Sequence, residues 1–472
     1  MARPAHALGF DNSPLERQAV ALTPTAPLPG WLQGVLLRTG PALFRLGPDQ
    51  LQHWFDGLAK LQRLSFAPDG VRYDSRFLQS QAYRAYGRTG RLASFEFASN
   101  PCRPCLRRGL EWLVGAPLTD NDNVNVLPLP DGNWLALSET TRPWRIGADS
   151  SLETLAPQTF HDRIDGPLTT AHPCWDRQRG ELLNLVLQLG LRSSYLFTSW
   201  DLRSSHRRLV ARLPVRAPAY QHSFAVTSRH LVLLESPLRV NPLVLRFSGR
   251  AYIDAYRWRA DQPLRITLLD RYSGAVVRVH ELDPGFHFHV VNAFERDGEV
   301  IVELPLYPDA AIVDGLRLTA LDQGCRLPAS RLVRLHLPLG SGGPRQELLL
   351  DDTVELPRIH PAWASRPHRF SYLAISHGGQ FLDGLVKVDS DAGVTHRYQV
   401  EGCFPGEPLF VAQPDGDRED AGVLLVMVLD AAASRSFLAV LEATDLREIS
   451  RLYLPDVVPF GFHGQFRFTS PC

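Results

Sequence analysis

Residues 123–139 have the sequence NVNVLPLPDGNWLALSE, in which two short apolar segments flank the turn-forming residues Pro, Asp and Gly. Runs of Val and Leu bounded by such residues are typical of β-strands that are joined by a tight turn. The same strand–turn–strand rhythm returns in RHLVLLESPL (229–238), GEVIVELPLY (298–307) and GVLLVMVLD (422–430). The pattern predicts an all-β protein that is built from many short strands.

Turn-forming residues are spread along the whole chain, with 37 prolines and 35 glycines. This distribution suits many short strands and argues against long helices or one discrete linker. No boundary divides the sequence, so we expect residues 1–472 to form a single domain. A β-propeller with divergent blades needs no strict sequence repeat, and seven blades would take about 67 of the 472 residues each.

Composition narrows the class of protein. Apolar residues make up 44% and charged residues 21%, which is ordinary for a globular protein with a large core and excludes disordered and collagen-like chains. Lys and Arg together number 50, as do Asp and Glu. A balanced charge creates no overall field that would attract nucleic acid, so we expect no nucleic-acid partner.

The N-terminal residues MARPAHALGFDNSPLERQ (1–18) lack the continuous apolar stretch of a signal peptide, and no later run of about 18 apolar residues could span a bilayer. We therefore expect a cytoplasmic protein. Its six cysteines are scattered, which predicts reduced thiols. Cys102 and Cys105 have the spacing of a zinc or redox pair, but no second ligand pair follows at a suitable distance.

Four histidines lie in separate, aromatic-rich segments that have the character of strands. They are His172 in TTAHPCWD, His222 in YQHSF, His289 in FHFHVVNAFE and His463 in PFGFHGQF. Neutral imidazoles bind Fe(II), and four of them could hold one iron while leaving positions open for dioxygen. The ligands are 50, 67 and 174 residues apart along the chain. Only a fold that returns repeatedly to one axis could gather them.

Nine phrases of the sequence, in order, resemble the carotenoid cleavage oxygenases, the family that includes the retinal-pigment-epithelium retinoid isomerase. They are LPGWLQGVLLRTGPALF, HWFDGLAKL, NDNVNVLPLPDGNWLALSET, TTAHPCWD, YQHSFAVT, FHFHVVNAFERDGEVIVEL, VELPRI, GEPLFV and PFGFHGQF. The resemblance implies a seven-bladed β-propeller with helical caps and loops, and Fe(II) bound on the propeller axis. By motif position, the implied ligands are His172, His222, His289 and His463.

Two further histidines lie inside these motifs. Members of the family usually have a pair of histidines before an Asn-containing phrase, and alignment on Asn292 places His289 at the first of the pair and Val290 at the second. We therefore interpret His289 as the ligand and His287 as its neighbour. We interpret His53, in HWFDG, as structural, because the iron of the family is not bound there.

Three glutamates match positions that the resemblance places just outside the ligands. They are Glu139 in ALSET, Glu355 in VELPRI and Glu407 in GEPLF, and the implied partners are His222, His289 and His463. A metal-bound imidazole usually donates its other ring N–H to a carboxylate or a carbonyl. Each glutamate lies in a largely apolar strand, where an unpaired carboxylate would be unfavourable.

The resemblance implies a non-haem Fe(II) dioxygenase that adds dioxygen to a carbon–carbon double bond of a carotenoid or apocarotenoid and yields two carbonyl products. Three alternatives stay open. The first is stilbene cleavage, although stilbene-cleaving members place a lysine before the first outer glutamate, and Ser138 occupies that position here. The other two are a non-cleaving isomerase and a propeller that acts as a binding module.

A water-insoluble polyene must be drawn from a membrane, so an apolar patch beside the cavity mouth and peripheral membrane contact are expected. CRPCLRRGLEWLVGAPL (102–118) is a candidate, with apolar Leu106, Leu110, Trp112 and Leu113 on one helical face and Arg103, Arg107 and Arg108 for lipid headgroups. A short helix that packs on the propeller cap would have the same sequence pattern. NPLVLRFSGRAYIDAYRW (241–258) is a second candidate, for the substrate channel, and core packing explains it almost equally well.

Overall fold

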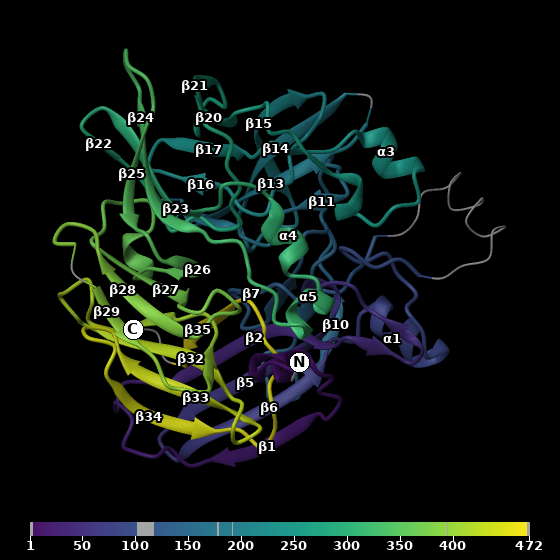
Figure 1. Cartoon of the computed structure of the whole chain (residues 1–472), viewed down its shortest axis with the longest axis vertical. Helices are drawn as coiled ribbons and strands as arrows, with labels where there is room; N and C mark the ends of the chain where they lie inside the picture. The colour runs from purple at the N-terminus through teal and green to yellow at the C-terminus, as the bar shows by residue number, and fades with distance from the viewer. Residues whose placement is uncertain (1–2, 102–117, 177–178, 191, 394, 470–472) are drawn as a thin grey trace.

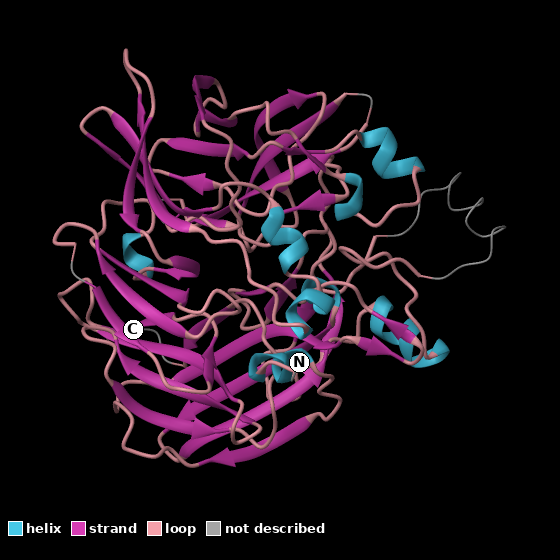
Figure 2. Cartoon of the chain, in the orientation of Figure 1, coloured by secondary structure: helices cyan, strands magenta, loops and turns pink. Residues whose placement is uncertain are grey.

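The computed structural model of this chain describes residues 3–101, 118–176, 179–190, 192–393 and 395–469. Strands predominate in this part of the chain, and its helices are short (Figure 2). The strands form seven antiparallel sheets of four or five strands, which follow one another in sequence order around a central axis (Figure 1). The protein is a seven-bladed β-propeller, so the predicted fold class is confirmed.

Each blade takes its strands from consecutive stretches of chain, except the first. Blade 1 contains β1 (Arg17–Leu22), β2 (Gly34–Leu43), β5 (Leu58–Ala67), β6 (Gly70–Phe77) and β35 (Gly464–Phe468). Blade 2 contains β7 (Asn125–Pro128), β8 (Trp134–Leu137), β9 (Trp144–Ile146) and β10 (Thr154–Pro157). Blade 3 contains β11 (Leu168–Thr169), β12 (Cys174–Asp176), β13 (Glu181–Gln188), β14 (Ser193–Trp200) and β15 (Arg207–Val215).

The remaining blades follow in the same direction. Blade 4 contains β16 (Ala225–Val226), β17 (His230–Glu235), β20 (Leu264–Asp270) and β21 (Val276–Leu282), and blade 5 contains β22 (Asn292–Arg296), β23 (Glu299–Leu306), β24 (Arg331–Pro338) and β25 (Arg345–Leu350). Blade 6 contains β26 (Thr353–Arg358), β27 (Phe370–Ser376), β28 (Gly384–Asp389) and β29 (Thr395–Tyr398). Blade 7 contains β30 (Cys403–Pro405), β31 (Leu409–Ala412), β32 (Gly422–Asp430), β33 (Arg435–Glu442) and β34 (Glu448–Tyr453).

Short elements lie outside the blades. They include two small ribbons, β3 (Arg45–Leu46) with β4 (Asp49–Gln50) and β18 (Leu238–Arg239) with β19 (Arg257–Trp258). In the described part of the chain the helices are α1 (Gln81–Thr89), α3 (Pro242–Phe247), α4 (Ala311–Gly315), α5 (Leu318–Asp322) and the 3-10 helices η1 (Ala5–Phe10), η2 (Trp54–Asp56), η3 (Ile253–Ala255) and η4 (Pro361–Trp363).

The segment 123–139 forms the hairpin of β7 and β8 that its sequence predicts. Leu127 pairs with Leu135 across the hairpin, and Gly132 occupies the turn with a φ of 89°, a backbone conformation that favours glycine. Strands in the middle of a blade are buried on both faces. In β32, Leu424 and Val426 pack toward blade 6 while Leu425 and Met427 pack toward blade 1. This two-sided burial explains why GVLLVMVLD is an unbroken apolar run.

The ring of blades is closed by the two ends of the chain. β35 pairs antiparallel with β2, from Gly34 opposite Phe468 to Arg38 opposite Gly464. In Figure 1 the purple N-terminal strands and the yellow C-terminal strands accordingly lie side by side. β35 is the innermost strand of blade 1, and it also lies against β7 of blade 2 and β31 of blade 7.

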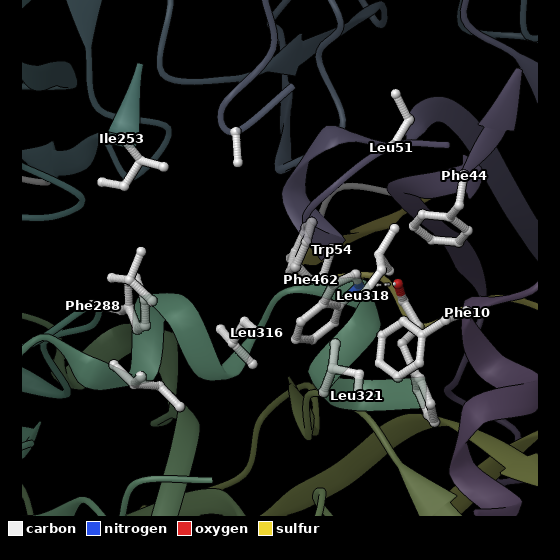
Figure 3. Close-up of a cluster of buried hydrophobic side chains, with 14 of the residues drawn as sticks. Phe10, Phe44, Leu51, Trp54, Ile253, Phe288, Leu316, Leu318, Leu321 and Phe462 are labelled. Carbon is white, nitrogen blue, oxygen red and sulfur yellow. Dashed lines mark hydrogen bonds between the residues drawn. The ribbon is translucent and has the colours of Figure 1, made fainter. Parts of the chain in front are cut away.

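An apolar cap covers one end of the propeller. Figure 3 shows some of its side chains, which come from η1, η2, η3, α4, α5 and the adjoining loops. Trp54 and Phe462 pack with ring centroids 4.6 Å apart, and the Trp54 indole N–H donates a 2.9 Å hydrogen bond to the Phe460 carbonyl oxygen. Burial of such aromatic side chains stabilises the fold by about 1.5–3 kcal/mol each.

The expected membrane patch lies almost entirely outside the described residues, because only Leu118 of segment 102–118 is described. In the second candidate segment, Tyr252 lines the main cavity, whereas Leu243 and Phe247 of α3 are 48% and 43% exposed. No helix in the described ranges is long and apolar enough to cross a membrane.

Candidate metal centre

The four histidines that the sequence singles out meet at the inner ends of the blades. His172 lies between β11 and β12, and the other three, His222, His289 and His463, lie one to three residues before β16, β22 and β35. One ring nitrogen of each lies within 4.8 Å of the corresponding nitrogens of the other three. Three segments that precede inner strands and the segment between β11 and β12 therefore bring together residues that are up to 291 positions apart, from 172 to 463.

The nitrogen that points toward the centre is Nε2. The Nε2 atoms of His172 and His222 are 3.1 Å apart, those of His222 and His289 are 3.3 Å apart, and those of His289 and His463 are 3.1 Å apart. Two imidazole nitrogens that bind one metal at about 2.1 Å and subtend about 90° lie about 3.0 Å apart. The spacing therefore fits a shared metal ion.

Three glutamates bind the opposite nitrogens of three of these rings. Nδ1 of His222 lies 2.7 Å from Oε1 of Glu139, and Nδ1 of His289 lies 2.6 Å from Oε2 of Glu355. Nδ1 of His463 lies 2.7 Å from Oε1 of Glu407. An Nδ1–H that donates to a carboxylate leaves the lone pair on Nε2, which is the tautomer that metal binding requires.

These seven residues come from seven different blades. His463 immediately precedes the innermost strand of blade 1, and His172, His222 and His289 belong to blades 3, 4 and 5. The glutamates come from the other three blades: Glu139 follows β8 of blade 2, Glu355 lies in β26 of blade 6, and Glu407 lies between β30 and β31 of blade 7. Each of these three glutamate–histidine hydrogen bonds therefore joins two blades.

The protonation of the histidines suits a cation at their centre. Burial, reinforced by the other histidines, lowers the pKa of His172 well below its usual value, and burial also lowers the pKa of His289 and brings that of His463 to about 4. Neutral imidazoles whose lone pairs converge at 3.1–3.3 Å repel one another unless a cation lies between them. The donor set therefore fits a metal that accepts nitrogen ligands.

A further layer of donors holds the glutamates. The hydroxyl of Tyr220 donates to Oε1 of Glu139 at 2.6 Å, the hydroxyl of Tyr307 donates to Oε1 of Glu355 at 3.2 Å, and Nε of Arg358 donates to Oε1 of Glu407 at 2.6 Å. Sequence reasoning missed these three residues. The only signal was proximity, since Tyr220 precedes His222 by two residues and Arg358 follows Glu355 by three.

The environments of two glutamates differ electrostatically. Burial raises the pKa of Glu355 to about 7. Burial alone would also raise the pKa of Glu407, but the positive charge of Arg358 and the hydrogen bonds from His463 and Arg358 outweigh it, so that the pKa falls below its usual value. Arg358 therefore keeps one buried carboxylate ionised beside the histidines.

An apolar cavity leads to the histidines. Its empty volume, open mouth included, is about 1230 Å³, and three of the four histidines line it together with a set of aromatic side chains, namely Trp54, Phe55, Phe95, Phe97, Phe288, Phe381 and Phe462. The ring of Phe288 lies 5.3 Å from that of His222, centroid to centroid. A cavity of this size can enclose a long apolar molecule beside the metal position.

The two histidines that we interpreted as non-ligands are not part of the group of four among the described residues. Nε2 of His53 lies 2.9 Å from the carbonyl oxygen of Val313, and its Nδ1 accepts a hydrogen bond from the backbone N–H of Phe55. Nδ1 of His287 lies 3.3 Å from the hydroxyl of Ser236. Both nitrogens of His53 are thus engaged by the cap.

Comparisons with known proteins agree with this architecture. The family model described as retinal pigment epithelial membrane protein matches residues 13–467. The chain is 33% identical to carotenoid cleavage dioxygenase 8 homolog A of Oryza sativa over 93% of this chain and 83% of that protein, and 31% identical to carotenoid isomerooxygenase of Galleria mellonella over 94% and 93%.

Among solved structures, a mutant of the Synechocystis apocarotenoid oxygenase superposes with a TM-score of 0.88 at 26% identity, and the alignment covers 98% of each chain. A cobalt-substituted form of the same oxygenase gives a TM-score of 0.87, with the same identity and coverage. With the fold and the match over nearly the whole sequence, the chain belongs to the retinal pigment epithelial membrane protein family, the family of the carotenoid cleavage oxygenases.

Proposed function

We propose that the protein is an Fe(II)-dependent dioxygenase that cleaves one carbon–carbon double bond of a carotenoid or apocarotenoid into two carbonyl products. The observation that carries the proposal is the group of four histidine nitrogens at the end of an apolar cavity, in a chain of this family. The names of its relatives, which include a carotenoid cleavage dioxygenase and an apocarotenoid oxygenase, support the same substrate class.

In this proposal His172, His222, His289 and His463 hold the iron, and Glu139, Glu355 and Glu407 orient three of the rings. When bound, Fe(II) supplies the position at which dioxygen reacts with the electron-rich double bond. Four neutral imidazoles leave the full charge of the ion in place, unlike a site with a carboxylate ligand. The three glutamates offset that charge from one layer further out.

The remaining residues act by orientation and by excluding water. The rings of Phe55 and Phe288 lie 6.3 Å and 5.3 Å from that of His222 and pack edge to face with each other, so a flat polyene that runs along them would pass beside the metal position. The apolar lining keeps water away from the reacting centre. Both atoms of dioxygen enter the two carbonyl groups, so the reaction needs no external reductant and no protein acid or base.

Product analysis tests the proposal. The Fe(II)-loaded protein is supplied with ¹⁸O₂ and with an intact carotenoid, an apocarotenal and a hydroxystilbene, and the products are identified by mass spectrometry. We expect paired carbonyl products from a polyene, each carrying one ¹⁸O atom, and their masses locate the cleaved bond.

The other outcomes identify the alternatives. Cleavage of the stilbene alone would overturn the carotenoid assignment. We do not expect it, because Ser138 stands where stilbene-cleaving members have a lysine, and its hydroxyl donates to Oδ1 of Asp122 at 2.6 Å. Isomerised polyene without oxygen uptake would show an isomerase. Bound iron with no conversion of any substrate would show a binding protein.

A further inference from the structure

Glu96 is a buried carboxyl group in the wall of the largely apolar cavity, apart from the glutamates that bind the histidines. It is 3% exposed and lines the cavity between Phe95 and Phe97, which also line it. None of the histidines or outer glutamates contacts it through a hydrogen bond in the described ranges, so the metal centre does not account for its presence. A polar group placed in an apolar substrate cavity is a candidate for recognising a polar group of the substrate.

The hydrogen bonds of Glu96 are unevenly divided between its two oxygens. The hydroxyl groups of Ser94 and Thr119 both donate to Oε1, at 2.5 Å and 2.9 Å. In the part of the chain that the structure describes, Oε2 receives no hydrogen bond. The backbone N–H of Glu96 donates to the carbonyl oxygen of Ser99 at 3.0 Å, which fixes the turn that carries the side chain.

The surroundings favour the protonated carboxyl group. Burial, reinforced by the negative charges of Asp56 and Asp120, raises the pKa of Glu96 to about 8, although the hydroxyls of Ser94 and Thr119 act in the opposite direction. With Oε1 already accepting two hydrogen bonds, the proton belongs on Oε2. The cavity wall then offers an O–H donor whose acceptor no described residue supplies.

We propose that Glu96 is a specificity-determining residue, whose protonated carboxyl donates a hydrogen bond to the oxygen atom of an aldehyde or alcohol at one end of the polyene. The inference rests on the proposed function, because it takes a polyene as the occupant of the cavity. It names the favoured substrate class as polyenes with an oxygen-bearing end group, in preference to pure hydrocarbons.

The aromatic lining connects Glu96 to the metal centre. Phe97 follows Glu96 in the chain, its ring centroid lies 5.1 Å from that of Phe55, and Phe55 lies 6.3 Å from His222 in a stacked orientation. A polyene that follows these rings from the histidines would bring its end to Glu96. A hydrocarbon end placed there would leave the carboxyl O–H without a partner, which is unfavourable in a buried site.

Anaerobic binding tests the inference separately from catalysis. Three polyenes of equal conjugated length, which end in an aldehyde, an alcohol or a methyl group, are titrated into the metal-loaded protein without oxygen. Quenching of tryptophan fluorescence reports binding, since Trp54 lines the cavity. We expect the aldehyde and the alcohol to bind about 10-fold more tightly than the hydrocarbon.

Two variants decide the role of the carboxyl group. Glu96→Leu should abolish the preference while the hydrocarbon binds as before, and Glu96→Gln, which keeps a donor, should retain most of it. If Glu96→Leu does not fold, Glu96→Asp replaces it, because the shortened side chain should lower the preference as well. Glu295→Gln is the matched control, since it alters a partly buried carboxylate that does not line the cavity.

Retention of the preference in Glu96→Leu, or equal weakening of all three polyenes, would overturn the inference and leave Glu96 with a structural role. The two proposals can fail separately. If the preference disappears in Glu96→Leu but the wild-type protein cleaves no polyene under oxygen, the binding inference holds and the proposed dioxygenase function fails. Metal content and melting temperature are measured for every variant, so that a folding defect is recognised.

Discussion

At the scale of single residues, the candidate site is a set of imidazoles whose two nitrogens have different partners. Nε2 of His463 points at the centre, and its Nδ1 lies 2.7 Å from Glu407. We expect His463→Ala to lose both the bound metal and the activity, because it removes one donor and leaves Glu407 without its histidine. Metal content by mass spectrometry and turnover measure the effect, and the same loss is expected for His172→Ala, His222→Ala and His289→Ala. A His463 variant with full iron and full turnover would contradict the assignment.

Substitutions of the glutamates should lower metal affinity or activity more than a substitution of the tyrosine that contacts one of them. Glu139→Gln and Glu355→Gln should lower metal affinity or activity roughly 10–100-fold, the usual effect of changing a partner of a metal ligand. Tyr220→Phe should have a smaller effect in the same direction, since it removes only the hydroxyl that donates to Glu139. Metal titration measures all three.

Tyr256→Phe is the matched control for Tyr220→Phe, because the hydroxyl of Tyr256 contacts that of Tyr252 at 2.9 Å and hydrogen-bonds no glutamate among the described residues. A wild-type titration for both glutamate variants would show that the carboxylates have no part in metal binding. Equal losses in the two tyrosine variants would show that Tyr220 acts through general packing of the aromatic lining.

The identities of the residues predicted the histidines and the glutamates of the site, but not the residues that hydrogen-bond to those glutamates. The histidines and glutamates stand in recognisable phrases, and the structure places His222 beside Glu139, although 83 residues separate them. Arg358 lies in the phrase VELPRI without any feature that indicates its role, and Glu96 lies in none of the nine phrases. The role of Arg358 depends on the register that brings blade 6 beside Glu407 of blade 7, and the role of Glu96 depends on Ser94 and Thr119, which lie outside the blades. Both arrangements follow from packing of the whole molecule, which one sequence does not display.

At the scale of secondary-structure elements, apolar runs between turn residues correctly predicted strands such as β23 (Glu299–Leu306) and β32 (Gly422–Asp430). Blade membership could not be predicted in the same way. The sequence GQFRF of β35 is an ordinary strand sequence, and its pairing with β2 depends on the closing of the ring. Apart from the glutamate–histidine pairs that the resemblance implies, the hydrogen bonds that join neighbouring blades could not be predicted, for the same reason.

Glu295 in β22 is such a junction between blade 5 and blade 4. Its carboxylate accepts hydrogen bonds from the turn between β16 and β17, from the backbone N–H of Arg229 at 3.0 Å, from Nδ1 of His230 at 2.8 Å, and from the hydroxyls of Thr227 and Ser228. Burial alone would raise the pKa of Glu295, but these hydrogen bonds outweigh it and lower the pKa to about 2.

A lowered pKa makes this contribution to stability dependent on pH. The ionised form is favoured in the folded protein, so the stabilisation is complete above the unfolded value near pH 4.3 and is lost as the pH falls from about 5 to about 2. Allowing for solvent screening, we expect it to amount to about 1–2 kcal/mol. Urea unfolding at several pH values should show that the free energy of unfolding falls less between pH 5 and pH 3 for Glu295→Gln than for the wild type. Parallel curves for the two proteins would contradict the assignment.

At the scale of the whole molecule, the closing strand and the candidate metal centre belong to one arrangement. His463 immediately precedes β35, whose pairing with β2 joins the two ends of the chain. The other six residues of the centre come from the other six blades. We propose that residues 1–472 unfold as one cooperative domain, because a cation bound at the centre would connect blades 1, 3, 4 and 5 directly and the rest through the glutamates.

Metal binding should therefore stabilise the entire ring against heat. A ligand at 100 times its dissociation constant stabilises the folded state by about 2.7 kcal/mol. An entropy of unfolding of about 2.1 cal/mol/K per residue gives about 1 kcal/mol/K for 472 residues, so the melting temperature should rise by about 3 °C when Fe(II) is added to the chelated protein. Calorimetry should show one transition that moves as a whole. The shift in melting temperature should vanish in both His172→Ala and His463→Ala, which alter residues far apart in the sequence. Two separate transitions, or a shift that persists in both variants, would show that the blades are not connected through this centre.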